Sequence, residues 1–114
     1  MTVSTKLISV IKVADVIYKI KNLEELARLG DKDDVLLLTI NKLTRYKIEE
    51  LERDLKEINT QLSVFEKKYK MKNEEFFSMF ESGKLGDNLD CMEWSSLLDM
   101  RERIKKRYNI LKGA

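Results

Sequence analysis

The stretch IEELERDLKEINTQLSVFEKKY, residues 48–69, decides the fold, because its apolar residues recur at alternating steps of three and four. These positions are Ile48, Leu51, Leu55, Ile58, Leu62, Phe65 and Tyr69. At that spacing all of them lie on one side of a helix, and a seam of about three heptads is typical of a helix that pairs with another. We therefore expect a long helix with one apolar seam.

The helix extends upstream, where its apolar residues cover several sides: Val35, Leu36, Leu37, Leu38, Ile40 and Leu43. Its start is predicted by Asp31, Asp33 and Asp34, which follow Gly30. Carboxylates there accept hydrogen bonds from free backbone N–H groups and favour the positive end of the helix dipole. The whole helix is then about 35 residues, or about 52 Å, long.

A second long helix is predicted at the C-terminal end, capped by Asp87 or Asn88. One of its faces carries Leu97, Met100, Ile104, Tyr108 and Leu111. This face matches the seam in length and period, so the simplest arrangement is an antiparallel helical hairpin, of coiled-coil type. The connection holds the Phe-rich segment EEFFSMFESG, residues 74–83, which Asn73 is placed to cap as a short helix and which Gly83 would end.

Charge favours the same pairing. Residues 49–57 hold five acids against two bases, and residues 101–107, RERIKKR, hold five bases against one acid. An antiparallel return brings the two segments side by side, so that ion pairs between them can select the register. We interpret RERIKKR as the flank of a helix pair rather than a nucleic-acid-binding arm.

The pattern of apolar residues over residues 3–20 is compatible with either a helix or a strand. Val3, Thr5 and Leu7 alternate like a strand, whereas Leu7, Val10, Ala14 and Ile17 recur like a helix, and we favour a helix from about residue 6. Asn22 followed by Leu23, Glu24 and Glu25 resembles a capping box, which predicts a separate short helix over residues 23–29 that ends at Gly30.

Composition limits the chemistry. The 114 residues fit one all-α domain (an N-terminal interaction segment, 1–30, and a hairpin, 31–114), with 37% charged residues, no Pro and a net charge of +2. His is absent and Cys occurs once, which removes His-based catalysis and most zinc sites and suits a reducing cytoplasm. Lys12, Asp15 and Lys19 interrupt the apolar N-terminal stretch, so we expect no signal peptide and no membrane span. We predict a protein that is not an enzyme and has no cofactor and no metal.

Residues 80–94, FESGKLGDNLDCMEW, hold two glycines, three spaced acids and the only Trp. A P-loop is excluded because Leu85 follows Gly83-Lys84 where Ser or Thr is needed, and the spacing of the acids does not fit an EF-hand. Asp90 and Glu93 are predicted on the inward face of the last helix, either where that face is still open to solvent or bonded to Lys84 and to the amides of the turn. We interpret the stretch as a hinge, with a partner contact or a magnesium site of Asp87, Asp90 and Glu93 as alternatives.

The C-terminal two-thirds resembles a largely uncharacterised family of small helical proteins of archaea and bacteria. The resemblance rests on three motifs: NKL-x-R-Y at 41–46, F-E-x-x-Y at 65–69 and G-x-L-G-D-x-x-D-x-x-E-W at 83–94. In the last motif the matching residues are Gly83, Leu85, Gly86, Asp87, Asp90, Glu93 and Trp94. The family resembles the antitoxin half of toxin–antitoxin pairs and implies no catalytic residue for this chain.

We therefore predict a protein-binding module, antitoxin-like, with a small toxin-type protein as partner and a homodimer in isolation that is held by residues 3–43. The predicted partner-binding residues are Leu7, Val10, Ile11, Ile17, Val35, Leu36 and Leu38, because the apolar N-terminal third exceeds what the hairpin can bury. The alternatives are a DNA-binding regulator with Thr2, Ser4 and Lys6 on a ribbon, which no basic recognition helix supports, and a structural coiled-coil protein.

Overall fold

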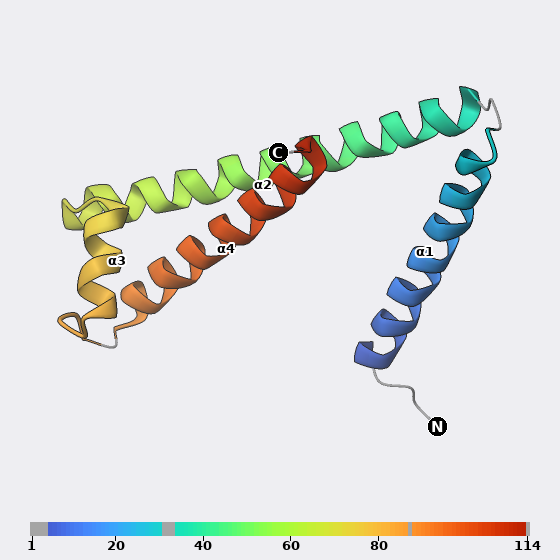
Figure 1. The fold of residues 1–114 in the computed structure, drawn as a ribbon. Helices are drawn as coiled ribbons and strands as arrows, with labels where there is room; N and C mark the ends of the chain where they lie inside the picture. The colour runs from blue at the N-terminus through green and yellow to red at the C-terminus, as the bar shows by residue number, and fades with distance from the viewer. Residues whose placement is uncertain (1–4, 31–33, 87, 114) are drawn as a thin grey trace. The chain divides into compact units, whose positions relative to one another are not determined.

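A computed structural model describes residues 5–30, 34–86 and 88–113, which form four α-helices (Figure 1). The helices are α1 (Thr5–Arg28), α2 (Asp34–Tyr69), α3 (Asn73–Glu81) and α4 (Leu89–Lys112). The predicted all-α class is confirmed, as are the long helix pair and the short Phe-rich helix between its members. Residues 1–38 and 39–114 form two structural units, which are described separately.

Helices α2 and α4 form the hairpin, and two contacts fix its antiparallel direction (Figure 1). At the closed end, Lys68 Nζ lies 2.7 Å from Asp90 Oδ2, which joins the last turn of α2 to the first turn of α4. Towards the open end, Tyr108 Oη donates to Glu52 Oε1 at 3.3 Å. Residues late in one helix thus meet residues early in the other.

The core of the hairpin lies near its closed end. Its buried apolar residues are Ile58, Leu62, Phe65, Phe76, Cys91, Trp94, Leu97, Leu98 and Ile104. The predicted seam is therefore buried from Ile58 to Phe65, Leu51 and Leu55 pack against the core from its edge, and Tyr69 at the end of the seam is exposed. Burying the seam and the facing side of α4 in one cluster supplies the hydrophobic stabilisation of this unit.

The predicted inward face of α4 needs one correction. Met100 was expected on that face but is 44% exposed, whereas Leu98 is buried. The reason is that α4 has two neighbours: α3 packs on it as well as α2, and Phe77 of α3 lines one groove together with Leu98. The buried side of α4 is consequently rotated towards α3 over its first turns.

The predicted break at Asn22 is wrong, because α1 runs without interruption from Thr5 to Arg28. Asn22 was expected to cap a new helix at this point, with Glu25 completing the capping box. The neighbouring Glu24 carboxylate instead accepts from Arg28 Nη2 at 2.6 Å, a contact one turn further along the same helix. No Pro or Gly lies within α1 to stop it, and Gly30, at φ +80°, follows its end as predicted.

The strand alternative for the N-terminal segment also fails over the described residues, since Lys6 lies within α1. Thr2, Val3 and Ser4, and likewise Asp31 and Asp33, lie outside the described residues. Asp34 is the first residue of α2. Over residues 5–30, 34–86 and 88–113, no helical segment meets the length and hydropathy that a bilayer span requires.

The expected ion pairs between the acids of α2 and the bases of α4 do not form among the described residues. The basic segment finds its acids within α4: Arg103 pairs with Asp99, and Lys105 Nζ lies 4.0 Å from Glu102 Oε1. Partners three or four residues away on the same helix are closer than those across the hairpin, and such exposed pairs stabilise little. Register is therefore set by the core.

Candidate functional site

The motif of residues 83–94 lies at the closed end of the hairpin and begins at Gly83. This glycine has φ +72°, a left-handed conformation that follows the end of α3. Leu85 is half-buried and packs against the core, while Gly86 is exposed and Asp87 lies outside the described residues. Asn88 then caps α4 as predicted, with its Oδ1 accepting from the Cys91 N–H at 2.7 Å.

Asp90 ties this stretch to the end of α2. Its Oδ2 accepts hydrogen bonds from Lys68 Nζ, at 2.7 Å, and from Tyr69 Oη. The bond from Lys68, followed by that from Tyr69, lowers the pKa of Asp90, and the same bonds raise the pKa of Lys68 and the pKa of Tyr69. The partners expected from the sequence, Lys84 and the turn amides, are not the ones that Asp90 uses.

Glu93 lies where α4 is open to solvent, which is one of the two arrangements expected for these acids. Its side chain is exposed, whereas that of Asp90 is 28% exposed. The buried side of α4 begins with Cys91 and Trp94, and this turns Glu93 towards solvent. The two carboxylates therefore do not converge on one point.

Trp94 is the centre of the closed end and is 2% exposed. Its ring contacts aromatic rings from two other helices: Phe65, at 5.5 Å between centroids, and Phe76, at 4.0 Å. Its Nε1 donates to Asn73 Oδ1 at 2.9 Å, and the Asn73 N–H donates to Glu66 Oε2 at 2.9 Å. One buried polar residue thus connects α2, α3 and α4.

The role of Asn73 differs from the expected one. The N-cap of α3 is Lys72, which makes no side-chain capping bond, and Asn73 is the first residue of the helix. Its amide is used by Trp94 instead. No sequence signal pairs positions 21 residues apart, because only the tertiary fold brings them together.

The polar contacts described at the closed end join the helices of the hairpin to one another. Among the described residues no three metal-ligating side chains gather at one point. Asp90 Oδ2 already accepts from Lys68 and Tyr69. The Trp94 N–H and the Asn73 side-chain carbonyl satisfy each other.

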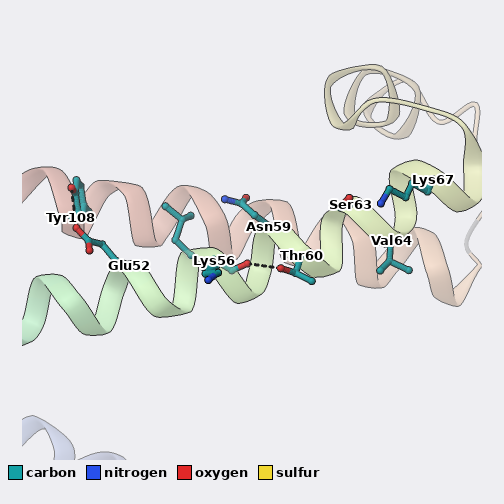
Figure 2. Close-up of a pocket in the computed structure, with 9 residues that line it drawn as sticks. Glu52, Lys56, Asn59, Thr60, Ser63, Val64, Lys67 and Tyr108 are labelled. Carbon is teal, nitrogen blue, oxygen red and sulfur yellow. Dashed lines mark hydrogen bonds between the residues drawn. The ribbon is translucent and has the colours of Figure 1, made fainter.

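A shallow groove of about 730 Å³ runs along α2 (Figure 2). Its lining mixes charge and small polar groups: Glu52, Leu55, Lys56, Asn59, Thr60, Ser63, Val64, Lys67 and Tyr108. Thr60 Oγ1 donates to the Lys56 carbonyl at 2.9 Å, and Tyr108 donates to Glu52. The first bond is local to α2, and the second joins α4 to α2.

The N-terminal helix α1 carries many exposed apolar side chains. Within α1 no residue is buried, and its large apolar side chains are between 37% and 66% exposed. They are Leu7, Ile8, Val10, Ile11, Val13, Val16, Ile17, Tyr18, Ile20, Leu23 and Leu26. The predicted partner-binding residues of α1 all belong to this set.

The first turns of α2 carry exposed apolar side chains as well. Val35 is 70% exposed, Leu38 is 67% exposed and Leu36 is half-buried, and these are the remaining predicted partner-binding residues. Sequence reasoning omitted further exposed residues of the same helix: Leu37, Ile40, Leu43 and Tyr46. Their signal was the apolar pattern that widens upstream of the seam.

No protein-family model, no curated protein and no solved structure matches this chain. The resemblance carried by the three motifs therefore stays a prediction.

Proposed function

We propose that the protein is a non-enzymatic protein-binding module, in which the apolar residues of α1 and of the first turns of α2 bind a partner and the hairpin serves as scaffold. One observation carries this proposal: α1 is a helix of 24 residues without a buried residue, although it holds eleven large apolar side chains. Contiguous exposed apolar surface of that kind marks interaction sites.

The amount of exposed surface supports an interface rather than a scatter of single residues. Eleven side chains at about half exposure leave on the order of 1000 Å² open, against about 300–600 Å² for the largest patch of an ordinary monomer. A standard interface takes about 800 Å² from each partner. Covering each side chain would contribute about 1 kcal/mol, so the sum reaches the cost of association, about 4–15 kcal/mol.

The kind of partner follows from the resemblance. An antitoxin-like module of the cytoplasm would bind a small toxin-type protein through this surface and, in isolation, a second copy of itself. The free thiol of Cys91, buried in the core, fits a reducing compartment. The RERIKKR segment makes its ion pairs within α4, which gives a nucleic-acid partner the lower rank.

Recovery of the tagged chain from its own cells, in three forms, tests the proposal. The wild type is compared with Ile11→Glu/Tyr18→Glu, which places charges on the apolar surface, and with Asp15→Asn/Lys19→Gln, which alters only an exposed ion pair of α1. We expect one protein at constant stoichiometry with the wild type and the control, and its loss with the first variant. Equal recovery with all three forms, or none with any, would reject the proposal.

The antitoxin-like role has its own test. The protein so recovered should slow growth when produced alone, and co-production of the wild-type chain should restore growth. Restoration by the Ile11→Glu/Tyr18→Glu variant as well would contradict a role for this surface.

A further inference from the structure

The continuity of α1 creates a stripe that a break at Asn22 would have divided. At 100° per residue, Val13, Val16, Ile20 and Leu23 lie on one side of an uninterrupted helix, with Ser9 before them and Ala27 after them. These six residues are called the Val13 stripe. Their steps are four, three, four, three and four, and none of them is charged. This is the spacing of a helix-pairing seam.

A second apolar face lies roughly opposite on the same helix. It holds Leu7, Val10, Ile11, Ala14, Ile17 and Tyr18, which are called the Ile11 face. The two differ in length, because Lys21, Glu25 and Arg28 replace the apolar residues of the Ile11 face beyond Tyr18. Lys12 and Lys19 separate the faces on one flank, whereas on the other flank Lys6 and Glu24 lie only at the two ends of α1 and Val13 is one turn from Ile17 between them.

A helix with two opposite apolar faces needs two occupants, since a single partner helix covers one stripe only. The Ile11 face matches the predicted partner-binding residues of α1. The Val13 stripe is exposed along its whole length, from Val13 at 58% and Val16 at 54% to Ile20 at 57% and Leu23 at 42%. Covering the Val13 stripe therefore requires a second molecule, different from the one that covers the Ile11 face.

We propose that the Val13 stripe is the homodimer interface and that it pairs antiparallel with the same stripe of a second copy, leaving the Ile11 face open for the partner protein. This inference rests on the proposed function and divides its surface into two sites. Two-fold pairing uses one patch twice, so the patch must be complementary to itself.

The order of residues along the stripe supplies that complementarity. The stripe is symmetric about residue 18, so an antiparallel copy places Val13 against Leu23 and Val16 against Ile20. Each layer then joins a smaller side chain to a larger one, which keeps the layers even and lets them interdigitate. A parallel copy would instead place like on like, with Ser9 against Ser9 at one end. Antiparallel helices also align their dipoles favourably.

The area is sufficient for a stable pair. The stripe and its flanks involve about half of the apolar surface of α1, and both copies contribute equally. That is on the order of 500 Å² from each copy and about 1000 Å² over the pair, which is the lower bound for a specific interface.

Sedimentation equilibrium of the full chain tests the assignment of the faces. We expect the wild type to be a dimer and Val16→Glu/Ile20→Glu to be a monomer, with a dissociation constant raised at least about 100-fold because carboxylates enter the interface. The matched control, Ile11→Glu/Tyr18→Glu, carries the same charges on the opposite face and should stay dimeric. A monomeric wild type, or two variants that behave alike, would overturn the inference.

Distances between spin labels test the direction of pairing. With Lys6→Cys the two labels of an antiparallel dimer lie about 36 Å apart along the helix axis, and with Lys19→Cys about 3 Å apart, at a rise of 1.5 Å per residue. A parallel dimer gives similar short separations at both positions and would refute the proposed pairing. The unsubstituted chain, carried through the same labelling, measures the background from buried Cys91.

The same variants separate this inference from the proposed function. If the Val16→Glu/Ile20→Glu chain is monomeric and still binds the recovered partner, both stand. If the wild type is monomeric yet binds the partner through the Ile11 face, the dimer fails alone. If dimers form and no variant affects any partner, the proposed function fails alone.

Discussion

Replacing Asn73 with Ala should destabilise the hairpin by about 1–2 kcal/mol, although Asn73 makes no capping bond. The substitution removes the only acceptor recorded for Trp94 Nε1, which donates to Asn73 Oδ1 at 2.9 Å from a side chain that is 2% exposed. Leaving a buried donor without a partner costs about 1–3 kcal/mol. Because α3 has no side-chain cap to lose and Ala favours a helix by a few tenths of a kcal/mol, the net value lies in the lower part of that range.

Urea unfolding followed by circular dichroism measures this effect. Fluorescence cannot serve for the whole set of variants, because Trp94 is the only Trp and one variant replaces it. The matched control is Asn59→Ala at an exposed position of α2, which should change the free energy of unfolding by less than about 0.5 kcal/mol. Trp94→Phe completes a double-mutant cycle, in which we expect a coupling of about 1 kcal/mol. Additive effects, or an Asn73→Ala chain as stable as the control, would refute the connection of the three helices through this residue.

Two further perturbations test the core and the closed end. Ile58→Asp places a carboxylate at a position that is 6% exposed, so it should lower the free energy of unfolding by more than about 3 kcal/mol and reduce the helical circular dichroism signal. The control Glu57→Asp, at the neighbouring position, should leave the stability nearly unchanged. A melting temperature of the Ile58→Asp chain equal to that of the wild type would contradict the hairpin core. Asp90→Asn should make the melting temperature depend less on pH at both the acidic and the basic end of the range. Hydrogen bonds from Lys68 and Tyr69 lower the pKa of Asp90, so its contribution is present above the ordinary carboxyl pKa and is lost as pH falls through its folded pKa. The bond to Asp90 raises the pKa of Lys68 and that of Tyr69, so their contributions are present below their ordinary values and are lost above about pH 10. Parallel curves for wild type and variant from pH 2 to 11 would count against this network.

The hairpin could be predicted from the sequence because its determinants are local and periodic. The seam of α2 repeats every three or four residues, and Ile58, Leu62 and Phe65 are buried as that period requires. Asn88 caps α4 through the backbone N–H three residues further on, a contact that depends on adjacent chain only.

The errors arose where tertiary contacts override local signals or, at Asn22, where the pairing within a continuous helix prevailed over a capping pattern. Asn22 carries a capping pattern, but nothing in α1 interrupts the helix, and Glu24 pairs forward with Arg28. Asn73 was expected to cap α3, but its amide accepts from Trp94, which lies on another helix. The packing of α3 on α4 likewise decided that Leu98 is buried and Met100 exposed, which a single helical period cannot indicate.

The candidate binding surface could be predicted in part. An excess of apolar residues over what one hairpin can bury is visible in the composition of the N-terminal third, and it pointed to Leu7, Val10, Ile11 and Ile17. The Val13 stripe could not be found in this way, because the expected break separated Ile20 from Leu23. Its recognition required the uninterrupted helix.

The central proposal is that α1 is an association element, covered by another chain. Amide hydrogen exchange at several protein concentrations tests it most directly, because most helical stability in proteins comes from packing of the apolar face. We predict that exchange of the α1 amides slows as the concentration rises, by mass action, while the amides around Leu62 and Trp94 exchange at a constant slow rate. Protection of α1 that is the same at every concentration would contradict the account.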